Sequence, residues 1–383
     1  MPEIGLILEG ISSLEDCGGV ATWARNLIQS LSDHTFAVFY FMNPAYTISE
    51  TIKYPNVTNH VKINSPIYPL DESVLFKTIH LENLPRCSLY HASSTGCASL
   101  LGMALAEKHK VPFLLTEHAI YWKELQYSHE LECGIRMEPV YSENLHHIAQ
   151  TAYRKATHIT SPVNFIRNQQ IEDGANSLKT VVIPNGIMVK SQKIKKEWDI
   201  QSIGFVGRIT RIKNLELFVQ IAEALLTFNK NLQYKIIGPV VDPYYFASLQ
   251  DWIHEHSLQN NIVFSGHINN NEWCNEIDCL ILTSQIESQP YVILEAFSHQ
   301  IPVMAPSVGG IPETMENAGF IFSPDSPINE IAKNINSILL NPSVLKDFVA
   351  SGWNLIQNKY HIDSMKNKFT MLYKHYLGAY VSG

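Results

Sequence analysis

Short apolar runs alternate with stretches of helical spacing along most of the chain. Val20–Leu31 carries apolar residues at intervals of three and four, which predicts an amphipathic helix, and helices are also predicted at Thr95–His109 and Val163–Ile171. Continuous apolar runs between helices are typical of strands in a parallel sheet that is covered on both faces. In the first half of the chain we predict such strands at Ile4–Leu8, Thr35–Phe41, Leu89–Ala92, Pro112–Thr116 and Thr157–Ser161. A further strand within Thr180–Ile187 is predicted to end in a Pro-Asn-Gly turn.

The alternation starts again after a polar, lysine-rich segment, Val189–Asp199, which has no apolar period and is predicted to be an interdomain linker. We therefore expect two α/β domains, residues 1–189 and 190–359, with a final helix at about 360–383 that packs back on the first domain. Asn341–Gly378 has helical spacing throughout. The strands predicted in the second domain are Ser202–Gly207, Tyr234–Ile237, Ile262–Ser265, Cys279–Thr283 and Ile301–Ala305.

Composition limits the class of protein. A length of 383 residues is natural for two domains. The net charge of −8 argues against nucleic-acid binding. Six cysteines without a Cys-x-x-Cys pair predict reduced, mostly buried thiols. The N-terminus does not resemble a signal peptide, and no apolar run approaches the roughly 18 residues of a membrane span. We expect a cytoplasmic protein; peripheral membrane association stays open.

The segment Ser284–His299 carries two carboxylates, Glu287 and Glu295, on either side of Pro290. It follows a predicted buried strand, and proline fits the first turn of a helix. A strand end followed by a helix N-terminus forms an anion site, here beside carboxylates that can hold hydroxyl groups. The segment therefore predicts binding of a sugar joined to a phosphate.

Three further segments place chemical groups between a strand and a helix. Gly18–Gly19 would let backbone N–H groups approach a phosphate or sugar, although a flexible turn explains it equally well. The Gly-x-Gly-x-x-Gly dinucleotide fingerprint is absent there. Glu117 and His118 follow a strand, which predicts a position at the mouth of a crevice. A purely structural histidine is the alternative.

Arg208 and Lys213 lie between the first strand of the second domain and the next helix. Two or three cations in this position are suited to a diphosphate, because arginine grips oxygens with paired hydrogen bonds and lysine supplies a point charge. A solvated basic loop is the alternative. Gly309–Gly310 precedes another helix and is expected to touch the same phosphates or sugar.

Taken together, these segments resemble the retaining glycosyltransferases of family four. That resemblance implies an α/β GT-B fold, in which two Rossmann-like, doubly wound parallel-sheet domains face a central cleft. The resemblance covers nearly the whole chain. The matching elements, in family order, are Gly18–Gly19, His118, Pro184-Asn185-Gly186, Gly207-Arg208 with Lys213, the pair Glu287 and Glu295, and Gly309–Gly310.

A closer resemblance is to the PelF-like branch, which works in exopolysaccharide synthesis. Leu115–Tyr121, Ile237-Gly238-Pro239 and the Gln289-Pro290 step are similar to that branch, as is the segment from Leu8 to Trp23. The resemblance implies UDP-glucose as the leading donor, ahead of GDP- or ADP-sugars. The acceptor would be a hydroxyl group whose identity the sequence does not reveal, and the chain is shorter than typical PelF proteins.

The resemblance also implies roles. Arg208 and Lys213 would neutralise the departing diphosphate, Glu295 would hold the ribose, and Glu287 the donor sugar. His118, from the opposite domain, would touch that sugar near the reacting carbon. Because the cations can do this work and no Asp-x-Asp motif is present, neither metal nor cofactor is expected. The expected catalytic residues are Arg208, Lys213, His118 and Glu287, and the expected donor-binding residues are Gly18, Gly19, Arg208, Lys213, Pro290, Tyr291, Val292, Glu295, Gly309 and Gly310.

Other functions remain compatible with parts of this pattern. A glycosidase would use the two glutamates as acid and nucleophile, but would leave Arg208 and Lys213 without a task. A GT-B protein that binds sugar nucleotides without turnover is the main alternative, since a fold does not fix a function. A GT-B epimerase is a smaller possibility. A phosphorylase would need a pyridoxal lysine, and none can be identified.

Overall fold

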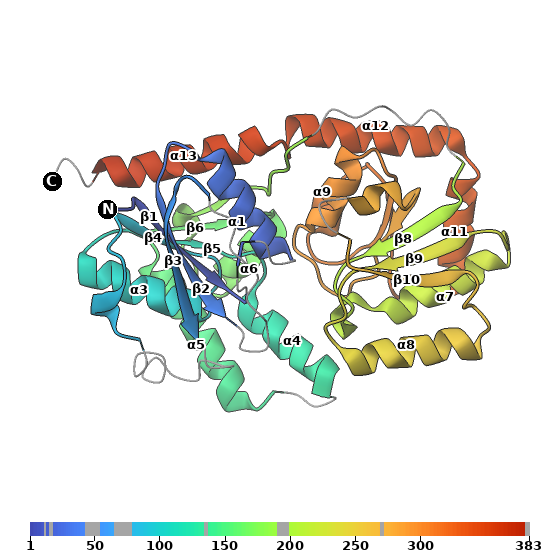
Figure 1. The fold of residues 1–383 in the computed structure, drawn as a ribbon, viewed down its shortest axis with the longest axis horizontal. Coiled ribbons are helices and arrows are strands. Elements are labelled where there is room, and N and C mark those ends of the chain that lie inside the picture. The colour runs from blue at the N-terminus through green and yellow to red at the C-terminus, as the bar shows by residue number, and fades with distance from the viewer. Residues whose placement is uncertain are drawn as a thin grey trace. The chain divides into compact units, whose positions relative to one another are not determined.

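A computed structural model describes the chain as two compact units, Met1–Gly186 with Ile362–Gly383, and Ile187–His361. Each unit is described by itself below and is drawn in Figure 1. Most of the predicted linker, residues 190–198, lies outside the described part of the chain. The described residues are 1–10, 13–14, 18–42, 54–64, 79–133, 137–189, 199–268 and 272–379.

The first unit is built on a seven-stranded, fully parallel sheet in the order β3-β2-β1-β4-β5-β6-β7. The sequence pattern predicted all of its buried strands but missed the edge strand β3, which alternates polar and apolar residues. The strands are β1 Ile4–Glu9, β2 Phe36–Met42, β3 Val57–Asn64, β4 Leu89–Ala92, β5 Phe113–Thr116, β6 His158–Ser161 and β7 Thr180–Val182.

Helices cover both faces of this sheet, as the apolar runs predicted. Tyr90 of β4 packs in the core formed with α3 and α5, whereas the next residue, His91, faces Trp23 of α1 and Tyr373 of α13. Alternation of side chains along a strand accounts for this division. The helices are α1 Gly19–Ser30, α3 Cys97–His109, α4 Tyr121–Cys133, α5 Pro139–Lys155, α6 Asn164–Glu172 and α13 Ile362–Ala379, with short 3₁₀ turns at Leu81–Asn83 and Ser177–Lys179.

The second unit repeats the scheme with six parallel strands in the order β10-β9-β8-β11-β12-β13. Helix α11 packs on α7, and α12 packs on α9. The strands are β8 Ser202–Val206, β9 Gln233–Ile237, β10 Ile262–Gly266, β11 Cys279–Ile281, β12 Val303–Pro306 and β13 Phe320–Phe322. The helices are α7 Leu215–Leu226, α8 Pro243–Glu255, α9 Tyr291–Ser298, α10 Ile311–Met315, α11 Ile328–Leu339 and α12 Pro342–Asn358, with 3₁₀ turns η3 Arg211–Lys213 and η4 Glu272–Asn275.

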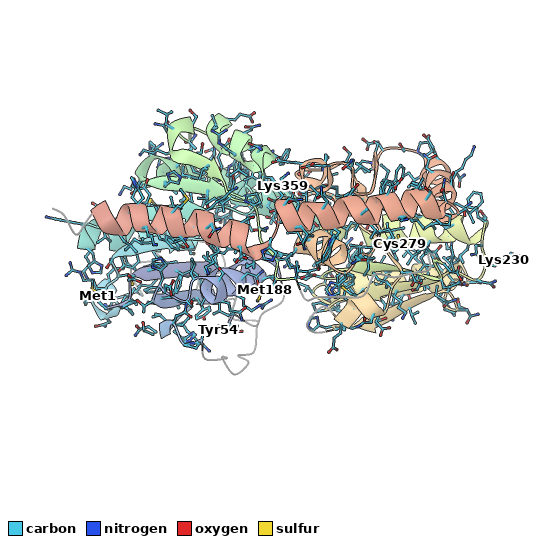
Figure 2. All side chains as sticks on the ribbon, turned by 90° about the horizontal axis from the view of Figure 1, so that it is seen from above. Met1, Tyr54, Met188, Lys230, Cys279 and Lys359 are labelled. Carbon is cyan, nitrogen blue, oxygen red and sulfur yellow. The ribbon has the colours of Figure 1, made fainter. Side chains whose placement is uncertain are left out.

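The C-terminal helical stretch is interrupted between α12 and α13. Lys359, labelled in Figure 2, opens this break. Tyr360 is buried, its carbonyl accepts a hydrogen bond of 2.9 Å from the Ile187 N–H, and its hydroxyl donates to the Thr314 carbonyl at 3.1 Å. The helical spacing alone does not mark this break, because a long-range contact fixes it; the expectation of a separate final helix from about residue 360 agrees with α13. None of the helices in the described ranges is both long and apolar enough to cross a bilayer.

Candidate functional site

In the second unit, three loops meet at the carboxyl ends of β8, β11 and β12. The Thr283 hydroxyl donates to the Lys213 carbonyl at 3.0 Å, and the Gln285 N–H donates to the Ile212 carbonyl at 2.9 Å. The Gly310 N–H in turn donates to the Glu287 carbonyl at 3.0 Å. These backbone contacts bring Lys213, Glu287 and the Gly309–Gly310 turn together.

Glycine at position 309 is required by this close approach. Gly309 has φ = +54°, and a Cβ atom there would lie 1.8 Å from the Glu287 carbonyl oxygen. The same situation recurs at Gly238, where φ is +152° and a Cβ would lie 1.8 Å from the Gly207 carbonyl oxygen. Only glycine allows these loops to pack so closely. Gly238 lies in the Ile237-Gly238-Pro239 segment, so both glycines belong to segments singled out in the sequence.

The cations of the loop after β8 have different surroundings. Lys213 Nζ forms an ion pair of 2.5 Å with Glu287 Oε1, and the two side chains are 19% and 13% exposed. Arg208 is exposed and forms no ion pair within the described parts of the chain. Arg211 instead packs over the Tyr245 ring at 5.2 Å, with its Nε 3.5 Å from Asp242 Oδ2. Within this loop Arg208 can therefore reach a ligand without breaking an ion pair, whereas Lys213 is held by Glu287.

Helix α9 begins at Tyr291, with Pro290 at its N-cap and no side chain capping it. The helix start predicted around Pro290 is therefore confirmed, and Glu295 follows in the second turn. Tyr291 is buried, while Val292 and Glu295 are half-buried. Burial and the neighbouring Glu295 carboxylate raise the pKa of the Cys274 thiol, which places that carboxylate near η4.

Three hydroxyl groups that the sequence analysis did not single out lie in the same loops. Thr210 Oγ1, Ser284 Oγ and Ser288 Oγ are buried and have no hydrogen-bond partner in the part of the chain that the structure describes. Buried hydroxyls nearly always have a partner, and an unmade bond costs about 1–3 kcal/mol. In the sequence, only their positions pointed to them: Thr210 lies between Arg208 and Lys213, and the two serines lie on either side of Glu287.

In the first unit, His118 follows β5 and lies against Trp23, with ring centroids 4.7 Å apart. Its Nε2 atom is buried and finds no hydrogen-bond partner among the described residues. Burial lowers the pKa of His118 to about 4. The imidazole is therefore neutral near pH 7, with one buried ring nitrogen that has no hydrogen-bond partner among the described residues.

His91 lies on the opposite edge of Trp23, at 5.6 Å between ring centroids. Its Nδ1 is 2.7 Å from the Tyr373 hydroxyl and its Nε2 is 2.6 Å from Thr116 Oγ1. Burial lowers the pKa of His91 to about 3. Both nitrogens of His91 are thus occupied, so it joins β4 to α13, whereas His118 keeps one nitrogen unpaired.

Glu117 does not lie at the mouth of a crevice, so that prediction was wrong. Its side chain is completely buried and its carboxylate accepts four hydrogen bonds. Burial is the main influence on its pKa, which is raised. A strand-end position alone did not reveal which way the side chain turns. The donors are Tyr153 Oη at 2.6 Å, Thr95 Oγ1 at 2.7 Å, Gln170 Nε2 at 3.1 Å and Tyr121 N at 3.2 Å.

Glu9 is a second organising carboxylate, and the sequence analysis missed it. At the end of β1 it accepts hydrogen bonds of 3.0 Å from the backbone N–H groups of Cys97 and Ala98, and so caps α3. The Tyr121 hydroxyl donates to it at 3.0 Å. Because Glu117 holds the backbone of Tyr121, the two glutamates fix the turn that carries His118 from both sides.

Gly18 and Gly19 lie at the start of α1, as predicted. Gly18 has φ = +134°, both glycines are exposed, and no side chain caps the helix. Four of the six cysteines are buried and form no disulfide within the described residues: Cys87, Cys97, Cys274 and Cys279. Within the described ranges, no three His, Cys, Asp or Glu side chains come together as metal ligands.

Residues 189–353 match the family of glycosyl transferases group 1. The matched residues lie within the second unit. The matched residues include Arg208, Lys213, both predicted glutamates and the Gly309–Gly310 turn. Residues 2–74 and 67–177 match a domain of unknown function, DUF3492. This match supports the expected resemblance to glycosyltransferases in the second half of the chain.

Among curated proteins, the chain is 24% identical over 268 residues to a phosphatidylinositol N-acetylglucosaminyltransferase subunit from Arabidopsis thaliana, covering 66% of this chain and 55% of that protein. The chain thus spans about half the length of this relative. The structure is similar to that of sucrose-phosphate synthase from Thermosynechococcus elongatus, with a TM-score of 0.77 and 17% sequence identity. The similarity covers 98% of this chain and 100% of that one. The structure is also similar to HepE of Anabaena in complex with UDP-glucose, with a TM-score of 0.74 and 17% sequence identity. This similarity covers 96% of this chain and 98% of that one. These similarities confirm the GT-B fold.

Proposed function

We propose that the chain is a retaining glycosyltransferase that moves a hexosyl group from a nucleotide sugar, with UDP-glucose as the leading donor, to an acceptor hydroxyl. The observation that carries the proposal is the arrangement of Arg208 and the Lys213–Glu287 pair at the strand ends of a glycosyl transferases group 1 domain. HepE, whose complexes hold UDP and UDP-glucose, shares the fold along nearly the whole chain. That likeness supports a uridine nucleotide ahead of guanosine or adenosine.

The donor roles follow the chemistry of each group. Arg208 and Lys213 hold the diphosphate, helped by the uncapped start of α9 after Pro290 and by the backbone at Gly309–Gly310. Tyr291 and Val292 belong to that helix start, and Gly18–Gly19 to the start of α1. Carboxylates accept hydrogen bonds from hydroxyl groups, so Glu295 holds the ribose and Glu287 the transferred sugar.

The reaction breaks the bond between the anomeric carbon and the diphosphate oxygen. Fixed cations stabilise the charge that grows on the departing diphosphate, and removal of one such group costs on the order of 10²–10³ in rate. The neutral His118 imidazole contacts the sugar near the reacting carbon. The acceptor hydroxyl attacks from the face that the diphosphate leaves, so the anomeric configuration is retained, and a phosphate oxygen takes its proton. The cations make a metal unnecessary.

We assign the chain to the PelF-like branch and to polysaccharide or glycoconjugate synthesis in the cytoplasm. The support is the Gln289-Pro290 step between the two glutamates, together with Gly238, which the packing of the loop after β8 requires. This assignment names the class of product but leaves the acceptor to experiment.

Calorimetric titration with UDP, GDP and ADP, followed by hydrolysis and transfer assays with the matching sugar nucleotides, tests the proposal. The expected result is binding of UDP in preference to GDP and ADP, with turnover of UDP-glucose. A folded protein that binds none of the three nucleotides contradicts the proposal. Binding without hydrolysis or transfer would instead favour a sugar-nucleotide-binding protein without activity.

A further inference from the structure

The Lys213–Glu287 ion pair joins two residues that the proposed function assigns to different parts of the donor. Lys213 is assigned to the diphosphate and Glu287 to the sugar, yet their side chains hold each other at 2.5 Å. With 19% and 13% of their surfaces exposed, water reaches neither group freely. The two assignments therefore depend on what happens to this contact when the donor binds.

The loops around the pair are fixed by backbone contacts. The Lys213 carbonyl accepts from Thr283 Oγ1 at 3.0 Å, and the Glu287 carbonyl accepts from the Gly310 N–H at 3.0 Å. Lys213 can thus turn its long side chain to a phosphate, while the shorter Glu287 stays where it is. A carboxylate shielded from water is destabilised when it loses its cation, unless another hydrogen-bond donor takes the place of that cation.

Arg208 provides the contrast within the same loop. It is exposed and has no ion pair in the described parts of the chain, so it can contact a phosphate without breaking an existing interaction. Its contribution should be equal for any ligand with a diphosphate. The contribution of Lys213 should depend on whether the ligand also offers something to Glu287.

We propose that Lys213 exchanges Glu287 for the donor diphosphate, and that hydroxyl groups of the transferred sugar replace Lys213 at Glu287. This inference rests on the proposed function and adds a specificity to it. With a nucleoside diphosphate alone, Glu287 loses its cation and gains nothing. With the intact sugar nucleotide both groups are satisfied, so the pair favours the donor over the product that remains after transfer.

A double-mutant cycle on ligand affinity tests the exchange. Calorimetry measures the Kd of wild type, Glu287→Gln, Lys213→Met and the double variant for whichever of UDP, GDP and ADP binds best, and for its glucose ester. Glu287→Gln should tighten binding of the nucleoside diphosphate at least about threefold more in the wild-type background than in the Lys213→Met background. The reason is that only the wild-type background contains an ion pair to break. The same substitution should weaken binding of the glucose ester.

Arg208→Ala is the matched control and should weaken both ligands by a similar factor. Circular dichroism and thermal unfolding check that each variant is folded, with Lys213→Gln in place of Lys213→Met if the latter is not. An equal effect of Glu287→Gln in both backgrounds would overturn the exchange, because Lys213 would then keep Glu287 while touching the phosphate. Failure of folded wild type to bind any of the three nucleotides would overturn the proposed function itself, and the exchange with it.

Discussion

The phenolic hydroxyl of Tyr153 donates a hydrogen bond of 2.6 Å to Glu117 Oε2 in the interior of the first unit. This contact joins α5 to the turn that follows β5. Glu117 precedes His118, so the network around the buried carboxylate also fixes the backbone of the proposed sugar-binding histidine. Glu117 is therefore a positioning residue in this proposal, and its surroundings can be tested separately from His118.

Tyr153→Phe should lower the free energy of unfolding by about 1–3 kcal/mol, because a buried carboxylate loses one of its hydrogen-bond donors. Urea unfolding followed by circular dichroism measures the change. The matched control is Tyr141→Phe in the same helix, where the side chain is 38% exposed and the change should stay within about 0.5 kcal/mol. Equal effects of the two substitutions would contradict the structural role given to Glu117.

Arg208→Ala and Lys213→Ala should each lower the turnover of the sugar nucleotide by on the order of 10²–10³, because each removes a cation from the diphosphate. Far-ultraviolet circular dichroism should remain that of wild type. Arg211→Ala is the control within the same loop. Since Arg211 is engaged with Tyr245 and Asp242, its loss should reduce turnover much less. Near-normal turnover in both Arg208→Ala and Lys213→Ala would sink the diphosphate assignment.

Gly309→Ala should destabilise the second unit and displace Glu287, because a methyl group at this position would lie 1.8 Å from the Glu287 carbonyl oxygen. Gly266→Ala is the control, because it measures the loss of stability caused by backbone strain without a clash. Gly266 also has a positive φ, +68°, but a Cβ there meets nothing within 4 Å. Strain of this kind costs roughly 1–2 kcal/mol. Thermal unfolding should show a larger loss for Gly309→Ala, and similar losses would argue against the close packing of these loops.

The free energy of unfolding should fall as the pH drops below 6.5, the ordinary pKa of histidine. Burial lowers the pKa of His91 to about 3 and that of His118 to about 4, so between these values and 6.5 the unfolded chain binds protons that the folded chain does not. At pH 5 the loss amounts to about 2 kcal/mol for each histidine. The raised pKa of Glu117 acts in the opposite direction, since the folded protein then binds that proton first.

Comparison of wild type with His91→Gln isolates one of these contributions. The variant loses hydrogen bonds and is less stable at pH 7.5, but its further loss between pH 7.5 and pH 5 should be smaller by about 2 kcal/mol. Urea unfolding at the two pH values measures both quantities. An identical loss in wild type and His91→Gln would show that His91 is not held neutral in the folded protein.

The apolar runs predicted most of the sheet because strands buried on both faces carry an unbroken hydrophobic signal. The same reasoning missed two edge strands, β3 and β13, and the helical spacing of Asn341–Gly378 did not itself mark the break between α12 and α13. Edge strands face solvent on one side, and the break at Tyr360 depends on contacts with residues far away in sequence. β3 therefore lacks the unbroken apolar run by which the buried strands were predicted, and local helical spacing does not reveal the break.

The sequence by itself determined which groups stand at the strand ends, because glycines, cations and carboxylates keep a fixed order relative to strand–helix junctions. Through its resemblance to a known family, this order led to the expectation of the GT-B fold, which the solved structures confirm. Only the tertiary structure decided what each group contacts: Lys213 pairs with Glu287, Arg211 is engaged elsewhere, and Glu117 is buried. The physical reason is that burial and pairing depend on where separate loops meet, which the order of residues along the chain does not record.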